Sequence, residues 1–138
     1  MLKYLVDTNI ISEQTKLTPN QGVVEKLTAH AAEVAIASTT WHELCFGVLR
    51  LPASHKRDRL TRFLDQLITD NLVILPYDTA AANWHATERD RLTRIGKPPA
   101  FEDSQIAAIA AVNHLTLVTH NESDFQFFQG IQLENWMR

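Results

Sequence analysis

The sequence predicts an α/β fold: a single three-layer α/β/α domain with a mostly parallel central sheet of four to five strands. Two observations lead to this prediction. Short apolar runs alternate with longer segments whose apolar residues recur at helical spacing, and capping or turn-forming residues separate the two kinds of segment. Strands that alternate with helices pair in parallel, and helices then cover both faces of the sheet.

The apolar runs give the predicted strands, and the periodic segments give the predicted helices. The predicted strands are residues 2–6, 34–37, 72–75, 115–118 and 131–133. The predicted helices are, approximately, residues 23–32, 40–50, 56–70, 79–95 and 103–112.

Capping and turn residues set the limits of the helices. Ser-Thr-Thr at residues 38–40 offers good N-cap residues for the second helix, and Pro52 ends it. Asp78 can cap the long fourth helix, which stops at the loop Gly-Lys-Pro-Pro over residues 96–99. The chain has neither internal repeats nor a linker, so residues 1–138 are predicted to form one domain.

Composition narrows the class of protein. An apolar fraction of 45% and a charged fraction of 21% are typical of a globular protein. No stretch approaches the ~20 apolar residues that span a bilayer, and the N-terminus has no signal pattern, so we expect no membrane association and a cytoplasmic location. The single Cys45 excludes a disulfide scaffold. A net charge of −3 argues against a dedicated nucleic-acid coat protein.

Four acidic residues are the main candidates for function. Asp7 closes the first strand, Glu43 lies early in the helix after the second, Asp103 opens the last long helix, and Asp124 follows the fourth strand. In a doubly wound sheet these positions share the edge formed by the carboxyl ends of the strands. Because clustered carboxylates are usually held together by a hard divalent cation, the sequence predicts a metal-dependent function.

Each acid also has a purely structural explanation. Asp7 can form an Asx turn or an N-cap, and Glu43 fits a capping box with Thr40. Asp103 suits the positive end of a helix dipole, and Asp124 can cap the short segment that follows it. None of these explanations accounts for four acids at one edge.

Two groups of basic residues are open to two interpretations as well. They could flank a phosphate backbone, or they could simply form the solvated faces of helices. The residues concerned are Lys56, Arg57, Arg59, Arg62, Arg89, Arg91, Arg94 and Lys97.

Taken together, four segments resemble the PIN-domain family, and within it the VapC-type toxins. The segments are Tyr4-Leu-Val-Asp-Thr-Asn9, Glu43-Leu-Cys-Phe-Gly47, Asp103-Ser-Gln-Ile-Ala-Ala-Ile-Ala110 and Leu117-Val-Thr-His-Asn-Glu-Ser-Asp-Phe125. The resemblance implies a metal-dependent endoribonuclease that uses Mg²⁺ or Mn²⁺, acts on RNA, forms a homodimer and is inhibited by a cognate antitoxin protein.

Carried over by position, the family's catalytic acids are Asp7, Glu43, Asp103 and Asp124. Asp7 and Asp103 are the expected direct metal ligands, whereas Glu43 and Asp124 could bind a second ion or orient water. Thr119 and Asn121 are the expected supporting polar residues. Glu102 and Glu122 are nearby alternatives to the fourth acid.

Metal-activated water would hydrolyse the phosphodiester and leave 5′-phosphate and 3′-hydroxyl ends. The main alternative is a non-catalytic RNA- or protein-binding module on the same fold. A phosphoacceptor signalling domain is disfavoured, because Pro76-Tyr77 follows the middle strand and no Lys follows Val118. A DxDxT phosphatase is disfavoured because Asp7-Thr8-Asn9 lacks a second Asp.

Overall fold

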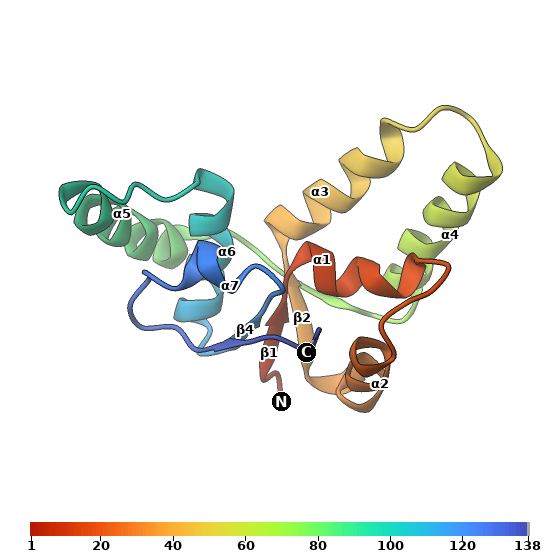
Figure 1. The fold of residues 1–138 in the computed structure, drawn as a ribbon, viewed down its shortest axis with the longest axis horizontal. Coiled ribbons are helices and arrows are strands. Elements are labelled where there is room, and N and C mark those ends of the chain that lie inside the picture. Colours follow the sequence, from red (N-terminus) through yellow and green to blue (C-terminus); the bar gives the residue numbers. More distant parts are fainter. Residues whose placement is uncertain (138) are drawn as a thin grey trace.

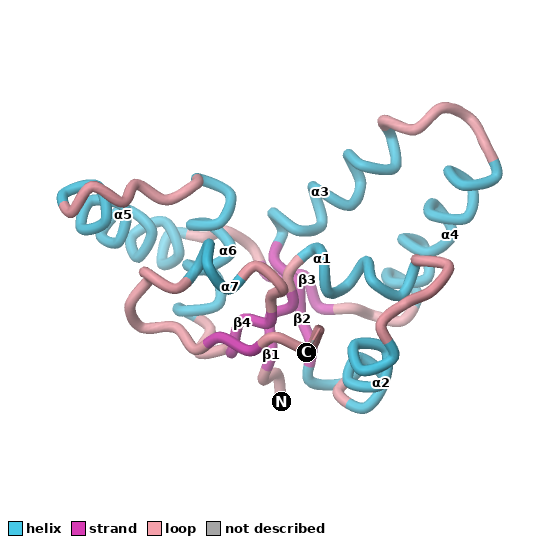
Figure 2. Tube along the Cα trace, in the orientation of Figure 1, coloured by secondary structure: helices cyan, strands magenta, loops and turns pink. Residues whose placement is uncertain are grey.

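Five parallel strands form the centre of the molecule, in the order β3-β2-β1-β4-β5 (Figures 1 and 2). The structure, a computed structural model, describes residues 1–137. The strands are β1 (Tyr4–Val6), β2 (Val34–Ala37), β3 (Val73–Leu75), β4 (Thr116–Val118) and β5 (Leu133–Glu134). The α/β class and the parallel sheet are therefore confirmed.

Helices cover the two faces of this sheet. The helices are α1 (Thr8–Ile11), α2 (Gln21–Ala29), α3 (Ser38–Leu49), α4 (His55–Thr69), α5 (Thr79–Arg94), α6 (Phe101–Val112) and α7 (Glu122–Phe125), with short 3₁₀ helices η1 (Ser12–Thr15) and η2 (Ala31–Glu33). In Figure 1, α1 to α4 lie on one side of β1, and α5 to α7 lie on the other. Within residues 1–137, none of the helices combines the length and apolarity needed to cross a bilayer.

Alternate residues of β1 enter two separate cores, one on each face of the sheet. Leu5 packs in a cluster with Ile109 of α6 and Leu92 of α5, whereas Val6 packs in a cluster with Leu44 of α3. Both strand residues are fully buried. Successive strand side chains point to opposite faces, so burial on both faces requires an uninterrupted apolar run rather than an alternating one.

Several boundaries differ from the sequence expectations. The first long helix begins at Gln21 because Asn20 caps it: the Asn20 Oδ1 accepts a hydrogen bond from the backbone N–H of Val23 at 3.1 Å. That helix ends at Ala29, and η2 follows. The fifth strand is shifted along the chain because its limits are set by pairing with β4, where Val118 lies opposite Glu134. Pairing across the sheet is not visible in local sequence.

The predicted start of the helix after β2 was wrong. That helix, α3, begins at Ser38 with Ala37 at the N-cap position, and no side chain caps it. Thr40 is buried inside the first turn. Glu43 therefore lies beyond the N3 position, and the capping box with Thr40 is not formed.

The central strands should be the most sensitive to loss of apolar volume. Ile36 of β2 is fully buried in the core that also contains Val6 and Leu44, whereas Ile68 of α4 is 50% exposed. We expect Ile36→Ala to lower the free energy of unfolding by about 2–5 kcal/mol, and the control Ile68→Ala to lower it by about 0.5 kcal/mol or less. Urea unfolding at unchanged slope would measure both, and equal losses would contradict the assignment of the core.

Candidate active site

The carboxyl end of β1 carries the most deeply buried acid of the site. Asp7 follows β1 directly and is 7% exposed. Parallel pairing places Val6 opposite Val118, and the Asp7 N–H donates to the carbonyl oxygen of Val118 at 2.8 Å. Thr119, which follows β4, therefore lies beside Asp7. Residues 112 positions apart in the chain are joined at one sheet edge.

Both oxygens of Asp7 accept hydrogen bonds, which fix the orientation of the carboxylate. Oδ1 accepts from the backbone N–H of Thr8 at 2.8 Å, and Oδ2 accepts from the Thr119 hydroxyl at 2.9 Å. The Thr119 oxygen in turn accepts from the backbone N–H of Asn121 at 3.0 Å. Burial raises the pKa of Asp7, as does the charge of Asp124, while the two hydrogen bonds oppose that rise.

Asp7 therefore also performs the structural role that its position suggested. It is the N-cap residue of α1 and accepts from the first helical N–H. The capping oxygen is Oδ1, so the cap and the contact with Thr119 use different atoms. A structural role and a functional role are compatible in this side chain.

Glu43 is brought to the same edge by α3, the helix that follows β2. Its Oε2 accepts a hydrogen bond from the Thr8 hydroxyl at 2.9 Å. Burial raises the pKa of Glu43, and the negative charges of Glu102 and Asp7 add to the rise. Thr8 thus contacts two of the four acids, one through its backbone N–H and one through its hydroxyl.

Asp103 lies in the first turn of α6, and Figure 1 shows α6 on the other side of β1 from α3, the helix that carries Glu43. Burial and the surrounding negative charges raise its pKa to about 6; the charges, in order of effect, are Asp124, Asp7, Glu43 and Glu102. Four elements of the fold therefore place acids within electrostatic reach of one side chain. The negative charges of all four residues act on the Asp103 carboxyl.

Asp124 occupies α7, a single helical turn after β4, and its side chain is exposed. The N-cap position of α7 is Asn121, and no side chain caps this helix. The alternative in which Asp124 caps the following segment is therefore wrong. The charge of Asp124 raises the pKa of both Asp7 and Asp103, which places it in the same group.

The remaining sequence candidates contribute in different ways. Thr119 is fully buried and contacts Asp7. Asn121 is exposed and contributes its backbone N–H. Glu102 is exposed beside Asp103, and its charge acts on both Glu43 and Asp103. Glu122 is half-buried in α7.

Sequence reasoning missed the roles of Thr8 and Asn9. The Asn9 Oδ1 accepts a hydrogen bond from the backbone N–H of His120 at 3.3 Å, which ties the segment after β1 to the segment after β4. Both residues lie in the first turn of α1, directly after Asp7. Their place in the segment Tyr4–Asn9 was the signal that could have indicated them.

The acids have a distinctive electrostatic setting. Over residues 1–137, the ion pairs formed by lysine, arginine and histidine all involve other carboxylates, so none joins a cation to Asp7, Glu43, Asp103 or Asp124. In the same part of the chain, no three acid, histidine or cysteine side chains converge closely enough to enclose an ion by themselves. The site is an open group of carboxylates that repel one another.

Comparison with known proteins shows the family to which the chain belongs. The model of the PIN domain matches residues 4–128. The "tRNA(fMet)-specific endonuclease VapC" of Salmonella typhimurium is 32% identical over 136 residues, which cover 99% of each chain. "Toxin FitB" of Neisseria gonorrhoeae is 36% identical over 124 residues, or 88% of this chain and 89% of that protein.

A solved structure shows the same architecture. The chain is similar to one in the crystal structure of DNA-bound VapBC from Salmonella typhimurium, with a TM-score of 0.83, 31% identity and 99% coverage of both chains. The family match covers most of the described sheet and all four acids. The chain therefore belongs to the PIN-domain family, and within that family it groups with the VapC-type ribonucleases.

Proposed function

We propose that this protein is an endoribonuclease toxin that uses Mg²⁺ or Mn²⁺ to hydrolyse RNA phosphodiester bonds, leaving 5′-phosphate and 3′-hydroxyl ends. The observation that carries the proposal is the group formed by Asp7, Glu43, Asp103 and Asp124. These acids come from four separate elements, and neighbouring negative charges help to raise the pKa values of Asp7, Glu43 and Asp103. Within residues 1–137, none of the four acids forms an ion pair. A protein that assembles such a group needs an external cation to offset the repulsion.

The donor set fits a hard divalent cation. All donors are carboxylate oxygens, which suit Mg²⁺ and Mn²⁺ rather than softer metals. Mg²⁺ usually keeps several waters and needs only one or two protein carboxylates, so an open group of acids is sufficient. Asp7 and Asp103 are the proposed direct ligands; Glu43 and Asp124 would hold a second ion or orient water.

A bound ion would supply an activated water and would offset charge on the phosphate. The protein's own residues would position the ligands. Thr119 and Thr8 hold the two oxygens of Asp7, so the carboxylate cannot rotate freely, and Thr8 also restrains Glu43. Neither threonine hydroxyl is suited to proton transfer at neutral pH, so we assign both to orientation.

The proposed regulation is inhibition by a cognate antitoxin. Solved relatives include "FitAcB from Neisseria gonorrhoeae", with a TM-score of 0.87 and 33% identity over 96% of this chain, and toxin–antitoxin complexes named VapBC. An arginine from such a partner could pair with the acids in the place of metal, because bidentate carboxylate contacts are strong when water is excluded. Homodimerisation is a further expectation from the family.

Replacing Asp7 tests the catalytic assignment directly. We expect Asp7→Asn to abolish metal-dependent cleavage of end-labelled total RNA, because a proposed ligand loses its charge. We also expect the metal-free variant to be at least as stable as the wild type, because burial and the Asp124 charge already disfavour the ionised form.

The control is Asp65→Asn, a change at an exposed position on α4, which should cleave normally. No cleavage by folded wild-type protein in Mg²⁺ or Mn²⁺, with antitoxin shown to be absent, would favour the non-catalytic binding module. A large loss of stability in Asp7→Asn would favour a structural role for the acid.

The pKa of Asp103 predicts how pH and metal should combine. A carboxyl whose folded pKa is about 6, against an ordinary 3.8, favours the folded state below about pH 4, and this contribution disappears as pH rises through about 6. The metal-free protein should therefore lose thermal stability between pH 4 and 7, while Mg²⁺ should stabilise it more at pH 7.5 than at pH 5. Thermal unfolding with Mg²⁺ or EDTA would measure this, and equal stabilisation at both pH values would contradict it.

A further inference from the structure

The structure separates the basic residues that are already neutralised from those that are available to a ligand. Arg91 pairs with Glu88 at 2.8 Å, and Arg94 pairs with Asp90 at 2.9 Å. These two arginines belong to the surface of α5. Lys56, Arg59 and Lys97, by contrast, form no ion pair within residues 1–137, and each lines a cleft.

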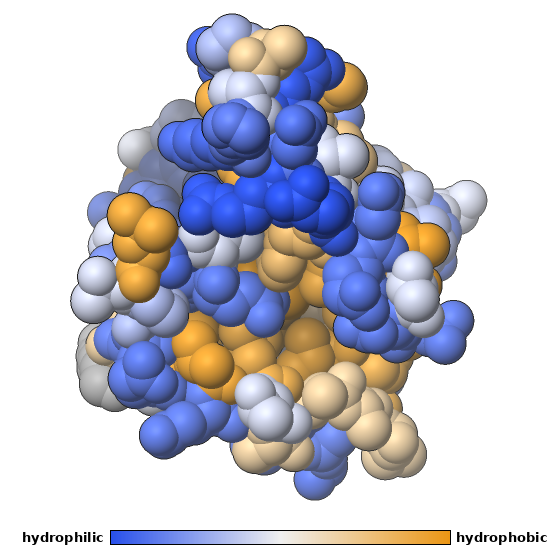
Figure 3. Space-filling model, turned by 90° about the vertical axis from the view of Figure 1, so that its right-hand side faces the viewer, coloured by the Kyte–Doolittle hydropathy of each residue, from blue (hydrophilic) through white to orange (hydrophobic). Residues whose placement is uncertain are grey.

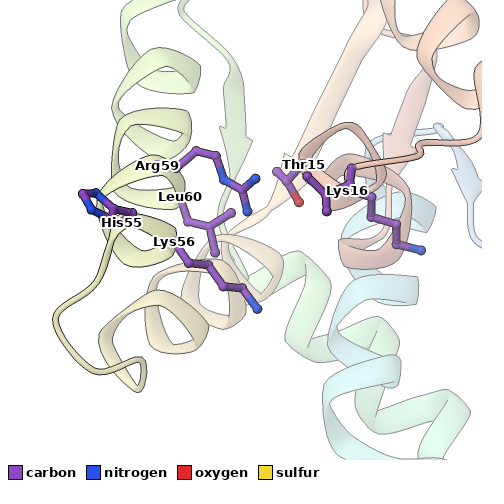
Figure 4. A pocket seen from close by; sticks show the side chains of 7 residues that line it. Thr15, Lys16, His55, Lys56, Arg59 and Leu60 are labelled. Carbon is purple, nitrogen blue, oxygen red and sulfur yellow. The ribbon is translucent and has the colours of Figure 1, made fainter.

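The first cleft lies between the start of α4 and η1 and has a volume of about 740 Å³. Figure 4 shows Arg59 and Lys56 extending from α4 into this cleft, with the Arg59 guanidinium facing Thr15, while His55 points away. Lys16 also lines the cleft, but Glu13 neutralises it at 2.9 Å. Figure 3, which faces the right-hand side of Figure 1, shows a strongly hydrophilic strip above a hydrophobic hollow.

This cleft continues to the acids. A neighbouring cleft of about 310 Å³ shares Lys56, Thr15 and Leu60 with the first and is also lined by Thr8 and Glu43. Thr8 and Glu43 belong to the candidate active site. Lys56 therefore lines both the cleft that contains Glu43, whose other walls are mainly apolar, and the cleft that contains Arg59.

A third cleft begins at Asp103 and Asp124 and lies on the other side of β1 from the first two. It has a volume of about 260 Å³, and its lining includes Asp103, Asp124 and Lys97. The Lys97 ammonium lies 4.2 Å from the centre of the Phe127 ring, which is 45% exposed. An exposed aromatic ring beside a cation is the combination that single-stranded nucleic acids bind, by base stacking and phosphate contact.

The wall of this third cleft is held firmly. The Arg91 Nη2 donates to the carbonyl oxygen of Phe127 at 2.8 Å, and the Glu88 Oε1 accepts from the backbone N–H of Gln129 at 2.7 Å. Glu88 is buried. We call the pair Glu88 and Arg91 the clamp. It fixes the backbone around Phe127, which lines the same cleft as Asp124, and none of the four acids of the site takes part.

We propose that single-stranded RNA crosses the acids from one cleft to the other, with its phosphates bound by Lys97 on one side and by Lys56 and Arg59 on the other. This inference rests on the proposed nuclease function, and it specifies the path of the substrate. A strand that is cut within its length must continue on both sides of the scissile phosphate. Because the acids repel an anionic strand and the chain has a net charge of −3, local cations must supply the attraction.

The test is the salt dependence of RNA binding by Asp7→Asn protein, which should hold the strand uncut. A fluorescent single-stranded RNA of mixed sequence is titrated in Mg²⁺ at increasing KCl. Each lost phosphate contact on a single strand should reduce the slope of log K against log salt by about 0.7. We expect a reduction of about 0.7 for Lys97→Gln and about 1.4 for Lys56→Gln combined with Arg59→Gln, each in the Asp7→Asn background.

Matched controls remove the same charge outside the clefts. Arg94→Gln breaks an exposed ion pair on α5, and Arg62→Gln changes α4 at a position that lines none of the three clefts. Both should leave the slope unchanged. The cleft variants in the otherwise wild-type protein should also cleave RNA more weakly at low substrate concentration than the controls.

The outcomes separate this inference from the proposed function. Metal-dependent cleavage by the wild type, with equal slopes for cleft variants and controls, would overturn the RNA path and leave the nuclease intact. Absence of both cleavage and RNA binding would overturn the two together. If the Lys56 and Arg59 changes abolish binding of a polyglutamate peptide but leave the RNA slope unaltered, the first cleft binds an acidic protein segment and the proposed path is wrong.

Discussion

The pairing of β1 with β4 is the constraint on which the site depends. Because the strands are parallel and Val6 lies opposite Val118, the next residues of the two strands lie side by side at the same edge of the sheet. The register of the strands therefore fixes the contact between Asp7 and Thr119. A shift of the pairing by one residue would exchange the cores into which the side chains of β1 pack, and it would separate Asp7 from Thr119. The same apolar side chains that stabilise the sheet therefore also set the geometry of the acids.

The sequence was sufficient to predict the layers of the fold and the edge at which the acids gather. Continuous apolar runs such as Val34 to Ala37 indicate strands covered on both faces, and this follows directly from period and burial. The contacts of Glu43 could not be predicted, because local sequence offered a capping box while the fold offered Thr8, 35 residues away. The limits of β5 could not be predicted either, because only the pairing with β4 defines them.

The site combines rigid support with unfavourable electrostatics. Asp7 is fixed by the Thr8 N–H and the Thr119 hydroxyl, and Thr119 is itself fixed by the Asn121 N–H. Hydrogen bonds to an ionised carboxylate favour the charge, whereas burial and neighbouring acids disfavour it. The fold therefore holds the acids in position at some cost to its own stability, an arrangement expected where a ligand will complete the site.

The clamp formed by Glu88 and Arg91 has an evolutionary consequence. It fastens residues 127–129 to α5 through side chains that belong to neither the sheet nor the acid group. The four acids and the residues that shape their surroundings are thus held in place by different contacts. Selection could therefore reshape or replace the segment around Phe127 while the acids at the sheet edge keep their positions.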